Sequence, residues 1–110
     1  MRVQLPAEGS AAQRAQKFLG EGVNVVSAFH NVGAAKLAAS EDLGCDVLVF
    51  GDDKAAREQV VQLSEAMGLR AFHAGALCNS AAAEALTSVL IFINKNYDVG
   101  EAGIKITGKN

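Results

Sequence analysis

The spacing of apolar residues changes repeatedly along the chain between a helical period and the alternation typical of strands. Ser10 is a good helix N-cap, with Gln13 at the capping-box spacing. Positions 11, 15, 18 and 19 are then apolar and share one helical face. Gly20 and Gly22 follow, so we expect the helix to end there.

Three largely apolar segments predict strands, over residues 23–29, which are rich in β-branched valine, 46–50 and 69–72. The second is apolar on both faces, which is typical of a central strand in a parallel sheet. A short helix is expected around residues 34–39. Strands that alternate with helices imply parallel pairing with right-handed crossovers. We therefore predict an α/β fold, the three-stranded parallel half of a Rossmann-like sheet with covering helices.

Two further helices and a tail complete the pattern. Asp53 is the N-cap expected for a helix whose apolar stripe is Ala56, Val60, Leu63 and Met67, and Gly68 ends it. Residues 80–94 form the longest helix and are apolar nearly all round, so it should be covered on several sides. Residues 103–108 alternate as an edge strand or extended arm does.

Length and composition indicate one globular domain, 1–110, because half of the 110 residues are apolar and 20% are charged. Lysines and arginines are scattered, so nucleic-acid binding is not expected. The two cysteines lack metal-ligand spacing, and the start of the chain lacks the apolar segment of a signal peptide. The most apolar stretch, 81–93, is shorter than the roughly 20 residues of a membrane span. A cytoplasmic protein without a membrane partner is therefore predicted.

Few residues point to catalysis. Asp52 and Asp53 are adjacent, which favours a turn and helix cap over a carboxylate dyad. His30 and His73 each follow a predicted strand, where ligands of α/β sheets bind, although from the residues alone a surface-loop histidine is the favoured interpretation of each, more strongly for His73. No third ligand suggests a metal site, and Cys78 is interpreted as a structural thiol.

Glycine-rich phosphate-binding motifs are missing from the sequence. There is no G-x-G-x-x-G turn, P-loop or G-x-S-x-G elbow. The single G-x-G, Gly20-Glu21-Gly22, follows a predicted helix and precedes a strand, which is the wrong order for a dinucleotide turn. The residues alone therefore indicate half of an α/β sheet with two ligand-facing loops.

Four segments, in this order, resemble the NADPH-dependent reductases of the deazaflavin coenzyme F-420 (8-hydroxy-5-deazaflavin). They are SAFHNV at 27–32, CDVLVFGDD at 45–53, AGALCN at 74–79, and IFINKNY followed by AGIKITG between 91 and 108. Together they span most of the chain. The family usually has Asp and Pro where this chain has His73 and Ala76, so the role of position 73 and the rigidity of this turn differ.

The resemblance implies that the chain is the C-terminal half of such an enzyme, without the glycine-rich half that grips NADP. In the family, hydride passes between the nicotinamide and the deazaflavin, so the protein mainly positions two cofactors and no catalytic residue is expected. Six residues are expected to contact the deazaflavin side of the cleft. They are His30, Asn31, Val32, Gly75, Leu77 and Asn79. His30 would orient the ring or hydrogen-bond a ring carbonyl.

Three hypotheses follow. In the first, the chain is a part of the hydride-transferring oxidoreductase that is inactive alone and binds NADP weakly. In the second, it is a catalytically silent, self-associating assembly module. In the third, it is a small-ligand binder that keeps only the deazaflavin-side loops. A homodimer is the expected partner state, and a separate dinucleotide-binding half is the alternative partner. The interface is expected to use an exposed strand edge, a set of helix residues, or both, and these helix residues are Leu86, Val89, Leu90 and Phe92.

Overall fold

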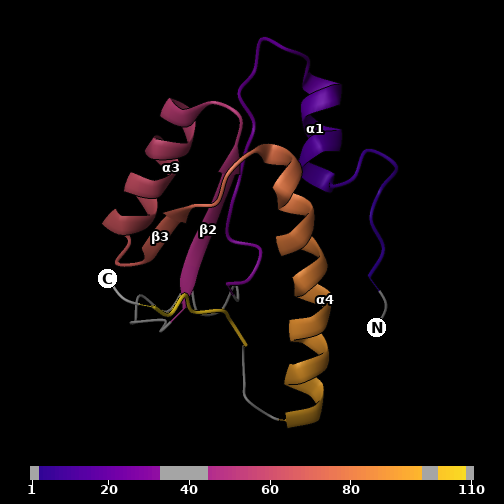
Figure 1. The fold of residues 1–110 in the computed structure, drawn as a ribbon, viewed down its shortest axis with the longest axis vertical. Coiled ribbons are helices and arrows are strands. Elements are labelled where there is room, and N and C mark those ends of the chain that lie inside the picture. The colour runs from indigo at the N-terminus through magenta and orange to yellow at the C-terminus, as the bar shows by residue number, and fades with distance from the viewer. Residues whose placement is uncertain (1–2, 33–44, 98–101, 109–110) are drawn as a thin grey trace.

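A small sheet flanked by helices forms the part of the chain that a computed structural model describes, residues 3–32, 45–97 and 102–108 (Figure 1). The predicted α/β class is confirmed, and the helix expected at 34–39 lies outside the described residues. In chain order the elements are α1 (Ala11–Leu19), β1 (Val26–Ser27), β2 (Asp46–Gly51), α3 (Lys54–Ala66), β3 (Arg70–His73), the 3-10 turn η1 (Leu77–Asn79) and α4 (Ser80–Tyr97).

The strands lie in the sequential order β1-β2-β3, as expected, but the sheet is mixed. β2 and β3 are parallel, whereas β1 is antiparallel to β2, with Val26 opposite Gly51 and Ser27 opposite Phe50. The prediction of three parallel strands was therefore wrong for β1. A helical pattern between two strands does not by itself require a crossover, because a connection can also return the chain at the same end of the sheet.

β1 is much shorter than the predicted 23–29 strand, and the side chain of Gln16 explains why. Its amide nitrogen donates to the carbonyl oxygens of Val23 and Gly20, at 2.7 and 2.8 Å, and its amide oxygen accepts from the backbone nitrogen of Val25 at 3.1 Å. These backbone groups are bonded to a helix side chain and not to a neighbouring strand. At the other end, Phe29 has φ of 66°, which leaves the extended conformation.

The helix ends follow the sequence pattern. Ser10 caps α1 by accepting from the backbone nitrogen of Gln13 at 3.0 Å. Asp53 caps α3 by accepting from that of Ala56 at 2.8 Å. Gly68 follows α3 with a positive φ. The capping residues therefore mark these boundaries correctly.

The apolar core lies between the sheet and α3. It consists of buried residues from β2, α3 and the connecting segments: Val32, Cys45, Val47, Val49, Val61 and Leu69. Val47 and Val49 are almost fully buried, as expected for the central strand. In Figure 1, α3 and α4 lie to either side of β2.

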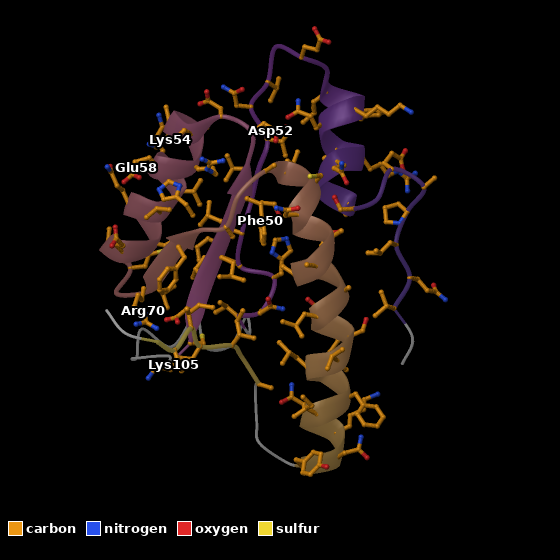
Figure 2. All side chains as sticks on the ribbon, in the orientation of Figure 1. Phe50, Asp52, Lys54, Glu58, Arg70 and Lys105 are labelled. Atoms are coloured by element: carbon orange, nitrogen blue, oxygen red, sulfur yellow. The ribbon has the colours of Figure 1, made fainter. Side chains whose placement is uncertain are left out.

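The C-terminal segment 102–108 crosses the start of the sheet as an extended arm. The backbone nitrogen of Asp46 donates to the carbonyl oxygen of Ile104 at 2.8 Å, and that of Ile106 donates to the Asp46 carboxylate at 2.6 Å. Arg70 donates to the same carboxylate through Nε and Nη2, at 3.0 and 2.6 Å. Figure 2 shows Arg70 near Lys105, where β2 begins. One buried carboxylate thus joins two strands and the arm.

α4 is less covered than its apolar sequence led us to expect. Leu90 and Ala83 are buried, but Val89, Phe92 and Tyr97 are 46%, 53% and 74% exposed. By length and composition alone, residues 77–97 would also be long and apolar enough to cross a membrane, with a mean hydropathy of 1.4 over an 18-residue window. Such a helix is weak evidence for a span, since core helices of soluble proteins share these properties. Within the described part of the chain, the predicted covering of this helix on several sides is therefore not found.

Candidate functional site

The segment that follows β1 is held in an uncommon conformation. Phe29 is the one non-glycine residue with positive φ among the described residues. Bulky side chains rarely adopt this conformation, and such strain is concentrated at functional sites. The bend directs the chain so that the His30 ring lies edge-on to Phe50, with ring centroids 6.0 Å apart. Phe50 belongs to β2, and its side chain lies between this strand and α4 in Figure 2.

His30 is the first member of a chain of hydrogen bonds that runs into α4. Its Nε2 lies 2.5 Å from the Ser27 hydroxyl oxygen and 3.3 Å from that of Ser80. The two serine oxygens are 2.6 Å apart, and Ser80 donates to Glu84 Oε2 at 2.8 Å. Ser27 and Ser80 are both buried. The end of β1 and the start of α4 therefore meet through polar contacts alone at this point.

The carboxylate of Glu84 closes this chain at the N-terminus of α1. Oε1 accepts from the backbone nitrogen of Ala11 at 2.6 Å, and Oε2 accepts from that of Ala12 at 3.3 Å. Burial acts to raise the pKa of Glu84, but the hydrogen bonds from Ala11, Ser80 and Ala12 together lower it below its usual value. Burial lowers the pKa of His30, and the nearby Glu84 charge opposes this only in part. The site therefore pairs an ionised carboxylate with a neutral imidazole.

Asn31 and Val32, which were expected to face a cofactor, are both buried. The Asn31 amide donates to the carbonyl oxygen of Ala83 and to Thr87 Oγ1, both at 3.3 Å. Thr87 in turn donates to the His30 carbonyl oxygen at 3.1 Å. Val32 packs in the core. These contacts fix the His30 segment against α4.

A shallow hollow of about 280 Å³ nevertheless opens beside this segment. Its lining combines apolar side chains with amide, hydroxyl and imidazole groups. Its lining residues are His30, Asn31, Val32, Thr87, Leu90, Ile91, Asn94 and Ala102. This volume is close to the lower end of the range for small-molecule sites, enough for part of a flat ring.

The other predicted loop is built on Gly75, Leu77 and Asn79. Gly75 has φ of 104°, and a Cβ there would lie 3.2 Å from Asn79 Nδ2. Leu77 is 2% exposed, and its backbone nitrogen donates to Asp52 Oδ1 at 3.0 Å. Only Asn79 presents an exposed side chain.

Leu77 lines a different hollow from the one beside His30. This hollow, of about 360 Å³, lies between α1 and η1 and also includes Gln13, Gln16, Lys17, Asp52 and Cys78. A neighbouring hollow of about 500 Å³ shares Gln16, Lys17 and Asp52 with it. Of the predicted residues, His30, Asn31 and Val32 thus line one hollow and Leu77 lines the other. Their contact with a cofactor is a prediction.

His73, which stands where the related family has Asp, belongs to a surface network. Arg57 Nε donates to His73 Nδ1 at 3.4 Å, and His73 Nε2 lies 2.7 Å from Glu58 Oε2. Arg57 also donates to the carbonyl oxygen of Gly51 at 2.6 Å and more weakly to that of Gly75 at 3.4 Å. The hydrogen bond from His73 lowers the pKa of Glu58. His73 therefore helps to hold the Gly75 turn.

Sequence reasoning missed the residues that hold His30 in place. Ser27 and Ser80 are small residues beside apolar segments, and Glu84 appeared as an isolated charge on an apolar helix. An ionisable residue within an apolar helix indicates a polar contact with another element, since such a residue is buried only when it has partners. The partner of Glu84 is a helix N-terminus 73 positions away, which no local pattern reveals.

Comparison with known proteins supports the resemblance seen in the sequence. No family model matches the chain. The F420-dependent NADP reductase of Methanothermobacter thermautotrophicus is 45% identical over 103 residues, which is 91% of this chain and 44% of the relative. That of Methanocaldococcus jannaschii is 40% identical over 108 residues, 96% of this chain and 48% of the relative. The chain thus spans about half the length of the curated relatives it matches.

A solved structure shares the fold. It is described as a candidate F420-dependent NADP reductase from Arthrobacter sp. FB24, and it matches 96% of this chain and 48% of its own with a TM-score of 0.82 at 22% identity. The architecture therefore defines an α/β protein with part of a Rossmann-like fold. Within that class the chain is related over nearly its whole length to the F420-dependent NADP reductases. The partial coverage of the relatives fits a match to one half of such an enzyme.

Proposed function

We propose that this chain is part of an oxidoreductase that transfers hydride between NADP(H) and coenzyme F-420, and that it supplies the deazaflavin-side loops. The observation that carries the proposal is the match of 91–96% of the chain, at 38–45% identity, to proteins named F420-dependent NADP reductase. Coenzyme F-420 and NADP are accordingly the cofactors proposed.

The hollow beside His30 suits one end of a flat heteroaromatic ring. Leu90 and Ile91 offer it an apolar wall, and His30 and Thr87 offer hydrogen-bonding groups. Rings of this type combine apolar faces with polar edges, which is the combination that ligand sites in proteins present. The residues present therefore fit the deazaflavin.

Hydride transfer would make few chemical demands on the chain itself. When bound, the deazaflavin supplies the ring carbon that accepts or releases hydride. His30 would hydrogen-bond the ring edge, and Asn31 and Thr87 would hold the His30 segment against α4. Accurate placement of the ring is the main contribution, because reaction needs the two carbons within about 3–3.5 Å.

The decisive test adds NADPH and oxidised coenzyme F-420 to the purified chain and follows the deazaflavin absorbance. A parallel titration without NADPH measures binding of the coenzyme. We expect binding without turnover by the chain alone, because its sequence lacks a G-x-G-x-x-G turn to grip the pyrophosphate. NADP should bind with millimolar affinity or worse, about 4 kcal/mol.

Two variants test the residues involved. His30→Ala and Asn79→Ala should weaken coenzyme binding, whereas Gln59→Ala on the exposed face of α3 should not. Coenzyme binding that is equal in all four proteins would show that the loops are wrongly assigned. If the folded wild-type chain does not bind the coenzyme at all, the proposal is contradicted, and a self-associating assembly module becomes the favoured function.

A self-associating module is the second candidate function. The exposed apolar side chains of α4 favour it, since large apolar side chains gathered on one element often contact a partner. Self-association is compatible with the oxidoreductase function if the dimer also presents the deazaflavin-side loops.

A further inference from the structure

We propose that Glu84 is a positioning residue that acts through Ser80 and Ser27 to hold His30 as the Nε2–H tautomer, which leaves Nδ1 as a hydrogen-bond acceptor. The four side chains come from β1, the segment after it and α4. They are connected by contacts of 2.5, 2.6 and 2.8 Å. The positions of the protons along this chain of hydrogen bonds follow from the Glu84 carboxylate at its end, which can accept a hydrogen bond but cannot donate one.

An ionised carboxylate accepts hydrogen bonds and donates none. Glu84 accepts hydrogen bonds from the backbone nitrogens of Ala11 and Ala12. Because Glu84 cannot donate, its contact with Ser80 requires the Ser80 hydroxyl to donate its only proton to the carboxylate. Ser80 can then only accept from Ser27, and the Ser27 proton is used in that contact. The remaining short contact, between Ser27 Oγ and His30 Nε2, therefore needs a proton on Nε2.

The opposite arrangement leaves a contact without a proton. If His30 carried its proton on Nδ1, Ser27 would have to donate to Nε2. The Ser27 and Ser80 oxygens, 2.6 Å apart, would then face each other with no hydrogen between them, because the Ser80 proton is held by Glu84. Two buried oxygens at that distance repel. The longer contact of His30 Nε2 with Ser80 Oγ, 3.3 Å, is compatible with the Nε2–H form, which can share its proton.

The surroundings keep both ends of the chain in the required charge state. The positive end of the α1 dipole faces Glu84, and Glu84 has a lowered pKa. The pKa of His30 is also lowered, by burial, so the imidazole is neutral at neutral pH. Among the described residues, Glu84 is the charged group that acts on His30.

A consequence for the ligand follows, and it rests on the proposed function. A neutral His30 whose Nε2–H is already used can offer a ligand only the Nδ1 lone pair. It would therefore recognise an N–H or O–H group at the ring edge. A hydrogen bond from His30 to a ring carbonyl, which the family resemblance implies, would need a free N–H that this arrangement does not provide.

Nuclear magnetic resonance of the full chain labelled with ¹⁵N-histidine tests the tautomer directly, because the protonated and unprotonated ring nitrogens have distinct shifts and couplings. The chain has two histidines, and His73→Gln assigns the His30 signals. We expect His30 to be mainly Nε2–H at pH 8. A mainly Nδ1–H signal in the wild-type protein would overturn the proposal, with no variant needed.

Glu84→Gln is the informative substitution, because an amide can donate where a carboxylate cannot. With its oxygen still accepting from Ala11, the Gln amide nitrogen would donate to Ser80, Ser80 to Ser27 and Ser27 to His30 Nε2. The major tautomer of His30 should therefore invert. Glu58→Gln, beside His73, is the matched control and should leave His30 unchanged.

Ser80→Ala offers a second route, since it frees the Ser27 proton for His30 and should raise the Nδ1–H fraction. A His30 tautomer unchanged in both folded variants would contradict the proposal. Adding coenzyme F-420 to the labelled wild-type chain then separates the two claims. Coenzyme that binds without moving the Nδ1 signal would refute the ligand part, and coenzyme that fails to bind would refute the proposed function while the tautomer result stands.

Discussion

A carboxylate oxygen of Glu84, in the first turns of α4, lies 2.6 Å from the backbone nitrogen of Ala11, the first residue of α1. The second oxygen accepts from the next backbone nitrogen along, that of Ala12. A helix leaves its first backbone N–H groups without intrahelical partners. Glu84 thus provides α1 with hydrogen bonds and a negative charge from another element, in addition to the Ser10 cap. α1 has no fully buried residue, so this contact is central to its attachment.

Glu84→Gln should therefore lower the free energy of unfolding by about 1–2 kcal/mol. Hydrogen bonds to charged groups contribute about 1.5–3 kcal/mol, and the amide retains one of them. Urea denaturation followed by circular dichroism measures the change. Glu65→Gln, on an exposed position of α3, is the matched control and should change stability by less than about 0.5 kcal/mol. Equal stabilities of the two variants would show that Glu84 does not anchor α1.

Asp46 should make stability dependent on pH at the acid side. The hydrogen bond from Arg70 is the largest cause of the lowered pKa of Asp46. A carboxyl whose pKa is lower in the folded state contributes stability above its unfolded pKa and loses it as the pH falls through the folded value. Asp46→Asn should therefore be less stable than wild type at pH 7, and the difference should shrink below pH 4.

The unfolding free energies of wild type and Asp46→Asn, measured between pH 3 and pH 7, check this prediction. Asp53→Asn is the control, because asparagine also caps helices well, and its stability should stay within about 0.5 kcal/mol of wild type at pH 7. The C-terminal arm should also loosen in Asp46→Asn, with faster amide exchange at Ile106, which donates to this carboxylate. If the difference in unfolding free energy between Asp46→Asn and wild type is the same at every pH, the contribution of Asp46 comes from packing and not from its charge.

Local pattern predicted the elements well where local chemistry sets them. Capping side chains at Ser10 and Asp53 and the glycines after α1 and α3 placed the helix ends within a few residues. The doubly apolar pattern of residues 46–50 identified β2 as the central strand. These features depend on neighbours in the sequence, so the sequence alone contains them.

Features that depend on distant contacts were not predictable in this way. The antiparallel pairing of β1 with β2 is not encoded in the local pattern, and the length of β1 depends on the side chain of Gln16. The polar chain from His30 to Glu84 includes the contact between Ser27 and Ser80, which are 53 positions apart. Resemblance to a family pointed to His30, but only the packing of α4 reveals the groups that hold its ring.

Gly75 should tolerate no side chain without cost. Its φ of 104° is rarely adopted by residues with a Cβ, and an added Cβ would press on Asn79 at 3.2 Å. Gly75→Ala should therefore lower the free energy of unfolding by about 1–2 kcal/mol. Gly22→Ala is the control, because a Cβ there meets nothing within 4 Å. Thermal unfolding of both variants decides the matter, and a Gly75→Ala protein as stable as the control would mean that the turn can relax.

Self-association should use the exposed face of α4, although not every residue that the sequence suggested. Leu90 is only 9% exposed and serves the interior, whereas Val89 and Phe92 are 46% and 53% exposed. Covering large apolar side chains contributes about 1.5–3 kcal/mol each, and a two-fold dimer would cover both copies. Phe92→Lys should therefore raise the dimer dissociation constant at least about tenfold, which corresponds to 1.4 kcal/mol. Gln59→Lys adds the same charge to exposed α3 and should have no effect. Light scattering over a dilution series is the measurement. A wild-type chain that stays monomeric and folded at low micromolar concentration would show that this face needs no second copy.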